Sequence, residues 1–129
     1  MTNKYKIIAL IGKSGAGKDT LLQEMIKILP NLHEIVSYTS RPQRDYEIDG
    51  KSYFFLSEEE FINRIHNNEM LEYTNFNNWY YGTGLKSVNP DKINIGVFNP
   101  SGVYALSQNP LIDLKIYYVT ASDRIRLIR

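Results

Sequence analysis

The chain has 129 residues, a formal net charge of +1, and a composition that is 43% hydrophobic and 22% charged. These values favour one soluble globular domain and exclude a global electrostatic field that would draw nucleic acid or a membrane surface. Without cysteine there are no disulfides or thiolate metal sites, and no apolar run reaches the roughly 18 residues of a membrane span, so we expect a cytoplasmic protein.

The predicted elements alternate between strands and helices. A run rich in β-branched residues predicts a buried strand over residues 5–11, and apolar residues at helical spacing predict a helix over 18–29, which Pro30 ends. The other predicted elements, in chain order, are strands over 35–39 and 53–56, a helix over 58–66 that begins with a capping box, strands over 70–76 and 93–98, a helix over 101–108, a strand over 114–120 and the start of a helix over 123–129.

This order predicts an α/β fold with an insertion. The strand–helix pattern at both ends predicts a parallel-sheet core, although a partial one, formed by residues 1–32 and 85–129. The strand-rich middle, residues 33–84, predicts a small antiparallel subdomain inserted into that core.

The strongest motif lies between the first strand and the first helix. The sequence G-K-S-G-A-G-K-D-T fits the G-x-x-x-x-G-K pattern of a phosphate-binding loop. Glycines let main-chain N–H groups point toward an anion, and the N-terminus of the following helix adds a positive potential. The expected ATP-binding residues are Gly12, Ser14, Gly15, Ala16, Gly17, Lys18, Asp19 and Thr20, with Lys18 reaching the β- and γ-phosphates.

One position departs from this motif. The residue after the lysine is ordinarily Ser or Thr, whose hydroxyl binds Mg²⁺, but here it is Asp19. A carboxylate is also a hard oxygen ligand for Mg²⁺, and it suits the first turn of a helix. Asp19 is therefore the candidate ligand for the Mg²⁺ that would accompany ATP.

A second group of polar residues lies in the middle of the chain. Arg41 and Arg44, three residues apart in a predicted loop, could clamp a phosphate, and tyrosine hydroxyls could donate to the same oxygens. A carboxylate such as that of Glu72 can accept two N–H groups from a purine edge. Taken singly, each residue could equally well be an ordinary surface or strand residue.

Five motifs resemble those of the guanylate kinase family and follow one another in the same order. They are the phosphate loop, T-S-R-P-Q-R, D-G-K-S-Y-F-F, L-E-Y and Y-Y-G-T. The resemblance implies that ATP and GMP (or dGMP) are the small-molecule substrates, with Lys18, Arg41 and Arg44 as catalytic residues. It implies these GMP-binding residues: Ser37, Arg41, Arg44, Tyr53, Glu72, Tyr81, Thr83 and Asn99.

The chain also departs from that family. Asn99 stands where the family commonly has aspartate, and the segment between Gly84 and Ile93 is shorter than usual. The chain ends at Arg129, before the arginine-bearing lid and C-terminal part that the family has. We therefore expect a C-terminally truncated kinase, for which both an active and an inactive chain remain alternatives.

Two alternatives remain at this point. A deoxynucleoside monophosphate kinase of bacteriophage type would share G-K-D-T and the short middle segment. A non-catalytic guanylate-kinase-like interaction module would share the fold, although Lys18 and the two arginines argue against it.

Overall fold

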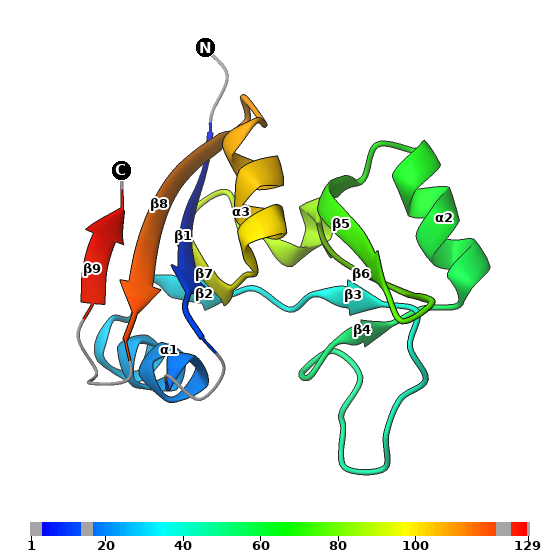
Figure 1. Ribbon diagram of the computed structural model, residues 1–129, viewed down its shortest axis with the longest axis horizontal. Helices are drawn as coiled ribbons and strands as arrows, with labels where there is room; N and C mark the ends of the chain where they lie inside the picture. The colour runs from blue at the N-terminus through cyan, green and yellow to red at the C-terminus, as the bar shows by residue number, and fades with distance from the viewer. Residues whose placement is uncertain (1–3, 14–16, 121–124, 129) are drawn as a thin grey trace. The chain divides into compact units, whose positions relative to one another are not determined.

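The computed structural model describes most of the chain as two compact units, each with its own sheet (Figure 1). The described residues are 4–13, 17–120 and 125–128. The core unit comprises Met1–Glu34 and Asn89–Arg129, and the inserted unit comprises Ile35–Val88. Among the described residues, no helix has the length and apolarity to cross a membrane.

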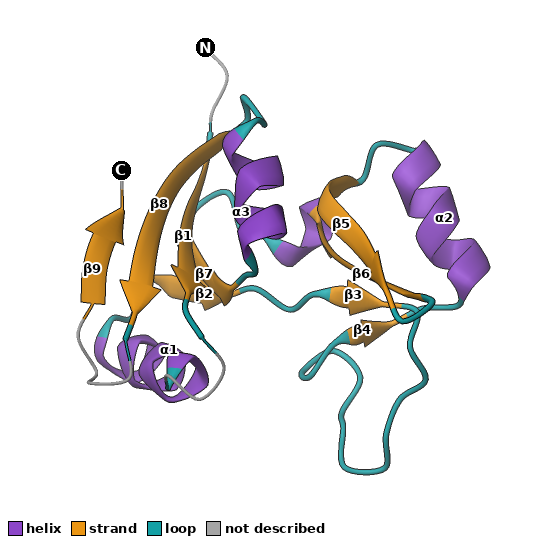
Figure 2. Cartoon of the chain, in the orientation of Figure 1, coloured by secondary structure: helices purple, strands orange, loops and turns teal. Residues whose placement is uncertain are grey.

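The core unit is built on a five-stranded sheet with the order β2-β7-β1-β8-β9 (Figure 2). Its strands are β1 (Tyr5–Ile11), β2 (Leu32–Glu34), β7 (Ile93–Val97), β8 (Ile112–Val119) and β9 (Ile125–Ile128). The first four strands in chain order pair in parallel, and β9 pairs antiparallel with β8. This is the parallel α/β core that the strand–helix alternation predicts.

Two helices belong to this sheet, α1 (Lys18–Ile28) and α3 (Pro100–Ser107). The apolar stripe of α1 packs on one face of the sheet in a cluster made of Leu10, Leu22, Leu32, Ile95 and Val119. The alternate residues of β1, Ile7 and Ala9, are also buried, so the central strand is covered on both faces. A rigid β1 in turn fixes the start of the loop that follows it.

The inserted unit holds a four-stranded sheet with the order β4-β3-β6-β5. Its elements are β3 (Tyr38–Thr39), β4 (Phe54–Phe55), α2 (Glu58–His66), β5 (Met70–Phe76), β6 (Trp79–Gly84) and the 3₁₀ turn η1 (Leu85–Ser87). β6 pairs antiparallel with both β3 and β5, whereas β3 and β4 pair in parallel. The small sheet is therefore mixed, whereas the sequence pattern predicts an antiparallel subdomain.

Helix α2 packs on one face of this small sheet. Phe61, which is fully buried, stacks on Tyr80 with 5.1 Å between ring centroids, and the Arg64 guanidinium lies 4.9 Å from the Tyr38 ring centroid. Gly84 makes room for Tyr38, because a Cβ there would lie 2.3 Å from the Tyr38 ring. Because side chains alternate along a strand, the neighbours of Tyr38 and Tyr80 lie on the face opposite α2.

Most predicted elements are present with small shifts at their ends, and the capped helix over 58–66 has the predicted bounds. The predicted strand over 35–39 is only β3, and β2 lies just before it.

The predicted helix over 123–129 is wrong for Ile125–Ile128, which form β9. A helix of one or two turns is costly to nucleate, whereas pairing with β8 satisfies the backbone of this segment at once.

Candidate active site

Two glycines of the loop between β1 and α1 stand where another residue would be disfavoured. A Cβ on Gly12 would lie 2.5 Å from the Val119 carbonyl oxygen, so only glycine fits there without a shift of the main chain. Gly17 precedes α1 with a φ of 87°, in the left-handed region that favours glycine. The Lys18 ammonium donates to the Gly12 carbonyl oxygen at 2.7 Å, so the lysine side chain folds back along the loop. The expected loop residues Ser14, Gly15 and Ala16 lie outside the described residues.

The candidate Mg²⁺ ligand Asp19 and the neighbouring Thr20 lie in the first turn of α1. Asp19 and Thr20 are both exposed. Thr20 lines a cavity of about 290 Å³ together with Gly17, Leu21, Glu24 and Val119. Within the part of the chain that the structure describes, no group of three or more acidic, His or Cys side chains is arranged to hold a metal ion.

The face of the small sheet opposite α2 gathers the polar residues of the inserted unit. Register pairs Thr39 with Tyr81 and with Phe55, and it pairs Glu72 with Thr83. Paired residues share a face of a sheet, and alternation along β6 puts Tyr81 and Thr83 on the same one. Strand pairing alone thus brings a carboxylate, a hydroxyl and a phenol from β5 and β6 onto one surface.

Arg41 forms the charged end of this surface. Its side chain is 6% exposed, and its guanidinium lies 5.3 Å from the centroid of the Tyr53 ring and 5.8 Å from that of Phe55. Tyr53 in turn contacts Tyr81 edge to face, with 6.1 Å between centroids. The guanidinium therefore lies against two adjacent aromatic rings, with the phenols of two tyrosines in the same cluster.

The other end of the surface holds two groups that the fold leaves poorly satisfied. The Thr83 hydroxyl is fully buried and makes no well-aligned hydrogen bond among the described residues, although it lies close enough to Glu72 to act on that carboxyl. Burial raises the pKa of the half-buried Glu72 carboxyl, and hydrogen bonding from the Thr83 side chain and main chain offsets part of that rise. Buried polar groups are ordinarily paired, so this end is suited to a ligand that supplies hydrogen-bond donors.

Comparison with known proteins identifies the family. The family model for guanylate kinase matches residues 4–94 of the chain. The chain belongs to the guanylate kinase family. The guanylate kinase of Thermotoga maritima is 43% identical over 93 residues, and that of Helicobacter hepaticus is 42% identical over 86 residues. A crystal structure of guanylate kinase from Anaplasma phagocytophilum has a similar fold, with a TM-score of 0.63 at 22% identity.

The matches cover different shares of the proteins. The alignment to the Thermotoga guanylate kinase covers 72% of this chain but 44% of that protein, and the alignment to the Helicobacter enzyme covers 67% and 43%. The chain thus spans less than half the length of these curated relatives. The similar structure covers 90% of this chain and 61% of the other. Sequence likeness to the guanylate kinase family therefore ends near β7, whereas the likeness of fold continues beyond it.

The structure brings some of the predicted GMP-binding residues together. Arg41, Tyr53 and Tyr81 form one cluster, and Glu72 and Thr83 form a second on the same sheet. Ser37 lies directly before β3, where its carbonyl oxygen accepts from the Phe54 N–H at 2.9 Å.

Two other candidates lie apart from these clusters. The Arg44 side chain is exposed and donates to the Tyr46 hydroxyl at 3.2 Å. Asn99 belongs to the core unit, where its side chain accepts from the Gly102 N–H at 2.7 Å and caps α3.

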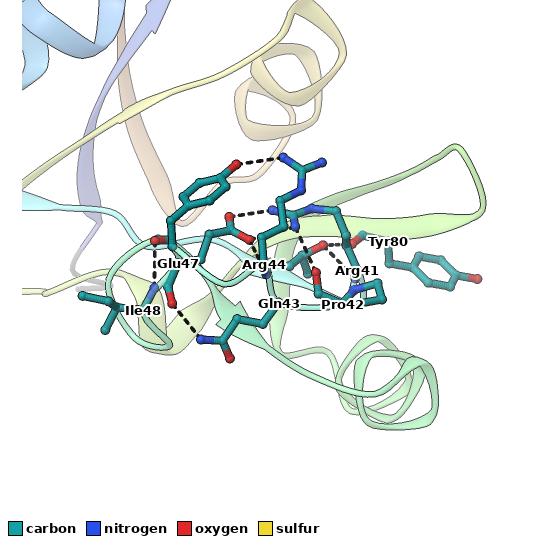
Figure 3. A network of polar contacts seen from close by, with 10 residues as sticks. Arg41, Pro42, Gln43, Arg44, Glu47, Ile48 and Tyr80 are labelled. Carbon is teal, nitrogen blue, oxygen red and sulfur yellow. Dashed lines mark hydrogen bonds and ion pairs between the residues drawn. The ribbon is translucent and has the colours of Figure 1, made fainter.

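Sequence reasoning missed Glu47, which is bound to Arg41. The carboxylate accepts from Arg41 Nη1 at 2.9 Å and from Nη2 at 2.8 Å, and its side chain is 7% exposed (Figure 3). This pairing lowers the pKa of Glu47 to about 2, and it raises the pKa of Arg41 further above its usual value. The signal in the sequence was an acidic residue six positions after an arginine, which polar loops also contain by chance.

Proposed function

We propose that the protein transfers the γ-phosphate of ATP to GMP or dGMP, as the guanylate kinase family name implies. One observation carries this proposal: a guanidinium packed against aromatic rings and a carboxylate–hydroxyl pair lie on the same face of one small sheet. A nucleoside monophosphate has a phosphate at one end and a base at the other, so both ends could bind this surface.

The Glu72 end favours guanine over adenine. Guanine presents two adjacent donors, its N1–H and its 2-amino group, and a carboxylate can accept both. Adenine presents an acceptor beside its amino group, so one Glu72 oxygen would face a lone pair. The Thr83 hydroxyl is buried beside Glu72, so it can donate to that carboxylate and help to hold it toward the base.

The Arg41 end suits the acceptor phosphate. A guanidinium binds phosphate oxygens with two parallel N–H groups, and the phenols of Tyr53 and Tyr81 can add neutral donors. In phosphoryl transfer the protein mostly positions the groups and stabilises charge, because there is little covalent chemistry for it to do. Arg41 and Arg44 would therefore act as catalytic residues by holding the nucleophilic phosphate.

ATP would bind at the loop before α1. The Lys18 ammonium has three N–H donors, so oxygen ligands in addition to the Gly12 carbonyl can bind it. Mg²⁺ typically takes one or two carboxylates together with substrate phosphates, and the exposed Asp19 carboxylate fits that donor set. When bound with ATP, the ion would neutralise charge on the transferred phosphate.

Calorimetry and a coupled assay for ADP test this function. We expect the chain to bind GMP more tightly than AMP, and we expect Lys18→Ala to weaken ATP binding while leaving GMP binding unchanged. Phosphorylation of dGMP, dTMP and dCMP, measured in parallel, separates a guanylate kinase from a phage-type kinase of broader acceptor range. A chain that binds neither ATP nor GMP would contradict the proposal and favour an interaction module.

A further inference from the structure

We propose that Glu47 is a positioning residue of the acceptor-phosphate site, one that fixes both the Arg41 guanidinium and the main chain at Arg44. The inference rests on the proposed function and goes beyond it, because Glu47 itself would not touch the substrate. For convenience, residues 41–47 are called the arginine loop.

The hydrogen bonds of the arginine loop converge on Glu47 (Figure 3). One carboxylate oxygen, Oε1, accepts from Arg41 Nη1 and from the Arg44 main-chain N–H, both at 2.9 Å. The Glu47 main-chain N–H donates to the Arg44 carbonyl oxygen at 3.0 Å, and the Glu47 carbonyl oxygen accepts from Gln43 Nε2 at 2.8 Å. Glu47 thus binds the Arg41 guanidinium with its side chain, and it binds the main chain of Arg44 with both its side chain and its own main chain.

Glu47 and Pro42 leave one edge of the Arg41 guanidinium to other groups, and the Tyr81 phenol also interacts with the guanidinium. Its Nη1 donates both to Glu47 and to the Pro42 carbonyl oxygen, at 2.9 and 3.0 Å, and its Nη2 donates to Glu47 at 2.8 Å. A guanidinium has five N–H donors, so the edge formed by Nε and the second hydrogen of Nη2 is not used by these contacts. That edge can bind a phosphate with two parallel hydrogen bonds while Glu47 holds the adjacent edge formed by Nη1 and Nη2.

A competing role for Glu47 would be that of an internal substitute for phosphate, which leaves when the substrate binds. Two observations oppose it. The carboxylate and Arg41 are both nearly buried, and a carboxylate that left its partner would lose a desolvated ion pair. Glu47 Oε1 also accepts from the Arg44 main-chain N–H, so a carboxylate that moved away would lose this bond as well and leave that N–H without it.

The test compares GMP with guanosine on Glu47→Gln by calorimetry or NMR titration. Glutamine has the same size but cannot accept both Arg41 N–H groups, because one of its ends is itself a donor. A loose catalytic or binding group can cost up to about 100-fold, and we expect Glu47→Gln to weaken GMP binding by about tenfold or more. Guanosine lacks the phosphate, so we expect its binding to be unchanged. Glu59→Gln, at an exposed position of α2, is the charge-matched control and should behave like the wild type for both ligands.

Two results would overturn the inference. One is GMP binding by Glu47→Gln that equals or exceeds that of the wild type, as an internal phosphate substitute would give. The other is an equal loss for GMP and guanosine, which would mean that Glu47 only maintains the fold of the unit.

A second variant and a wild-type measurement complete the test. If Glu47→Gln does not fold, Glu47→Asp keeps the charge but shortens the reach, and it should still weaken GMP selectively; wild-type affinity for GMP in that variant would equally overturn the inference. GMP binding by the wild type tests the proposed function, so an unaltered variant beside a binding wild type refutes the role of Glu47 alone.

Discussion

Two carboxylates of the inserted unit stand in opposite states. Glu47 in the arginine loop has a cation and a main-chain donor on its oxygens, and its pKa falls to about 2. Glu72 on β5 has no ion-pair partner among the described residues, and burial raises its pKa. The arginine loop is therefore satisfied by its own residues, whereas at the Glu72–Thr83 end burial outweighs the hydrogen bonding that Thr83 supplies to the carboxylate.

The difference indicates how each region would contribute to binding. A prearranged loop costs little to order when ligand arrives, because its hydrogen bonds already exist. A carboxylate held in a poorly solvated place costs stability, and proteins keep such strain mainly at functional sites. The comparison predicts that changes in the arginine loop lower both stability and binding, and that changes at the Glu72–Thr83 end lower binding but raise stability.

Arg41→Ala should have the largest effect. It removes the guanidinium that would hold the acceptor phosphate, and hydrogen bonds to charged groups are worth about 1.5–3 kcal/mol each, so the loss of two implies about 100-fold weaker GMP binding or more. It also leaves the nearly buried Glu47 carboxylate without its cation, so the thermal midpoint should fall. Calorimetry with GMP and a thermal melt measure the two effects.

Lys86→Ala is the control for Arg41→Ala, since Lys86 is an exposed cation of the same unit. It should change neither quantity. A normal thermal midpoint in Arg41→Ala would mean that the bond to Glu47 does not stabilise the fold, and the contrast between the two regions would be lost.

Glu72→Gln should separate binding from stability. A bidentate contact with a base edge discriminates by about 1–3 kcal/mol, so we expect GMP binding to weaken by about 5- to 150-fold. Inosine monophosphate lacks the 2-amino group, and the wild-type preference for GMP over it should shrink in the variant. Because glutamine carries no charge to bury, the ligand-free variant should melt higher than the wild type at pH 7. A lower melting temperature would show that Glu72 is satisfied in the folded chain.

Thr83→Val tests the same end with a smaller change. Valine has the shape of threonine, and it removes a fully buried hydroxyl that makes no well-aligned hydrogen bond among the described residues, although it lies beside Glu72. An unsatisfied buried group costs on the order of 1 kcal/mol or more, so the variant should be more stable by about that amount and should bind GMP a few-fold more weakly. Chemical denaturation gives the first quantity, and unaltered stability would mean that the hydroxyl finds a partner in solution.

The sequence predicts best those parts of the fold that local chemistry decides. The capping box of Ser57 and Glu60 marks the start of α2, and both of its hydrogen bonds are present in the structure. The loop before α1 is predicted from its glycines, and Gly12 does pass too close to Val119 for any side chain.

Parts decided by distant pairing could not be predicted. β2 has three residues and forms because β7 lies beside it, and β9 forms on the edge of β8. No local pattern distinguishes these short strands from a turn or from the first turn of a helix.

The candidate site shows the same division. Arg41, Tyr53, Glu72, Tyr81 and Thr83 were predicted from ordered motifs, and the structure gathers them on one face. Glu47 was not predicted, because the loop sequence R-D-Y-E-I-D-G contains three acidic residues and nothing in their spacing says which one turns back to an arginine. Phe55 beside Arg41 was missed as well, since an aromatic residue in a strand is ordinarily a core residue.

The smallest expected effect is on how stability varies with pH, and here the two carboxylates act with opposite sign. The pKa of Glu47 is lowered from 4.5 to about 2 on folding, so its contribution is present above pH 4.5 and is lost as pH falls through about 2. The pKa of Glu72 is raised, so its protonated form favours folding, and that contribution is lost as pH rises through its folded value.

Denaturation curves from pH 7 down to 2 should therefore change in different ways in the two variants. Glu47→Gln should flatten the loss of stability below pH 4.5, because the ion pair that acid removes is already absent. Glu72→Gln should steepen the net loss on acidification, because it removes a group that gains stability as it takes up a proton. If both variants give curves parallel to that of the wild type, the two carboxylates do not differ in the way their surroundings indicate.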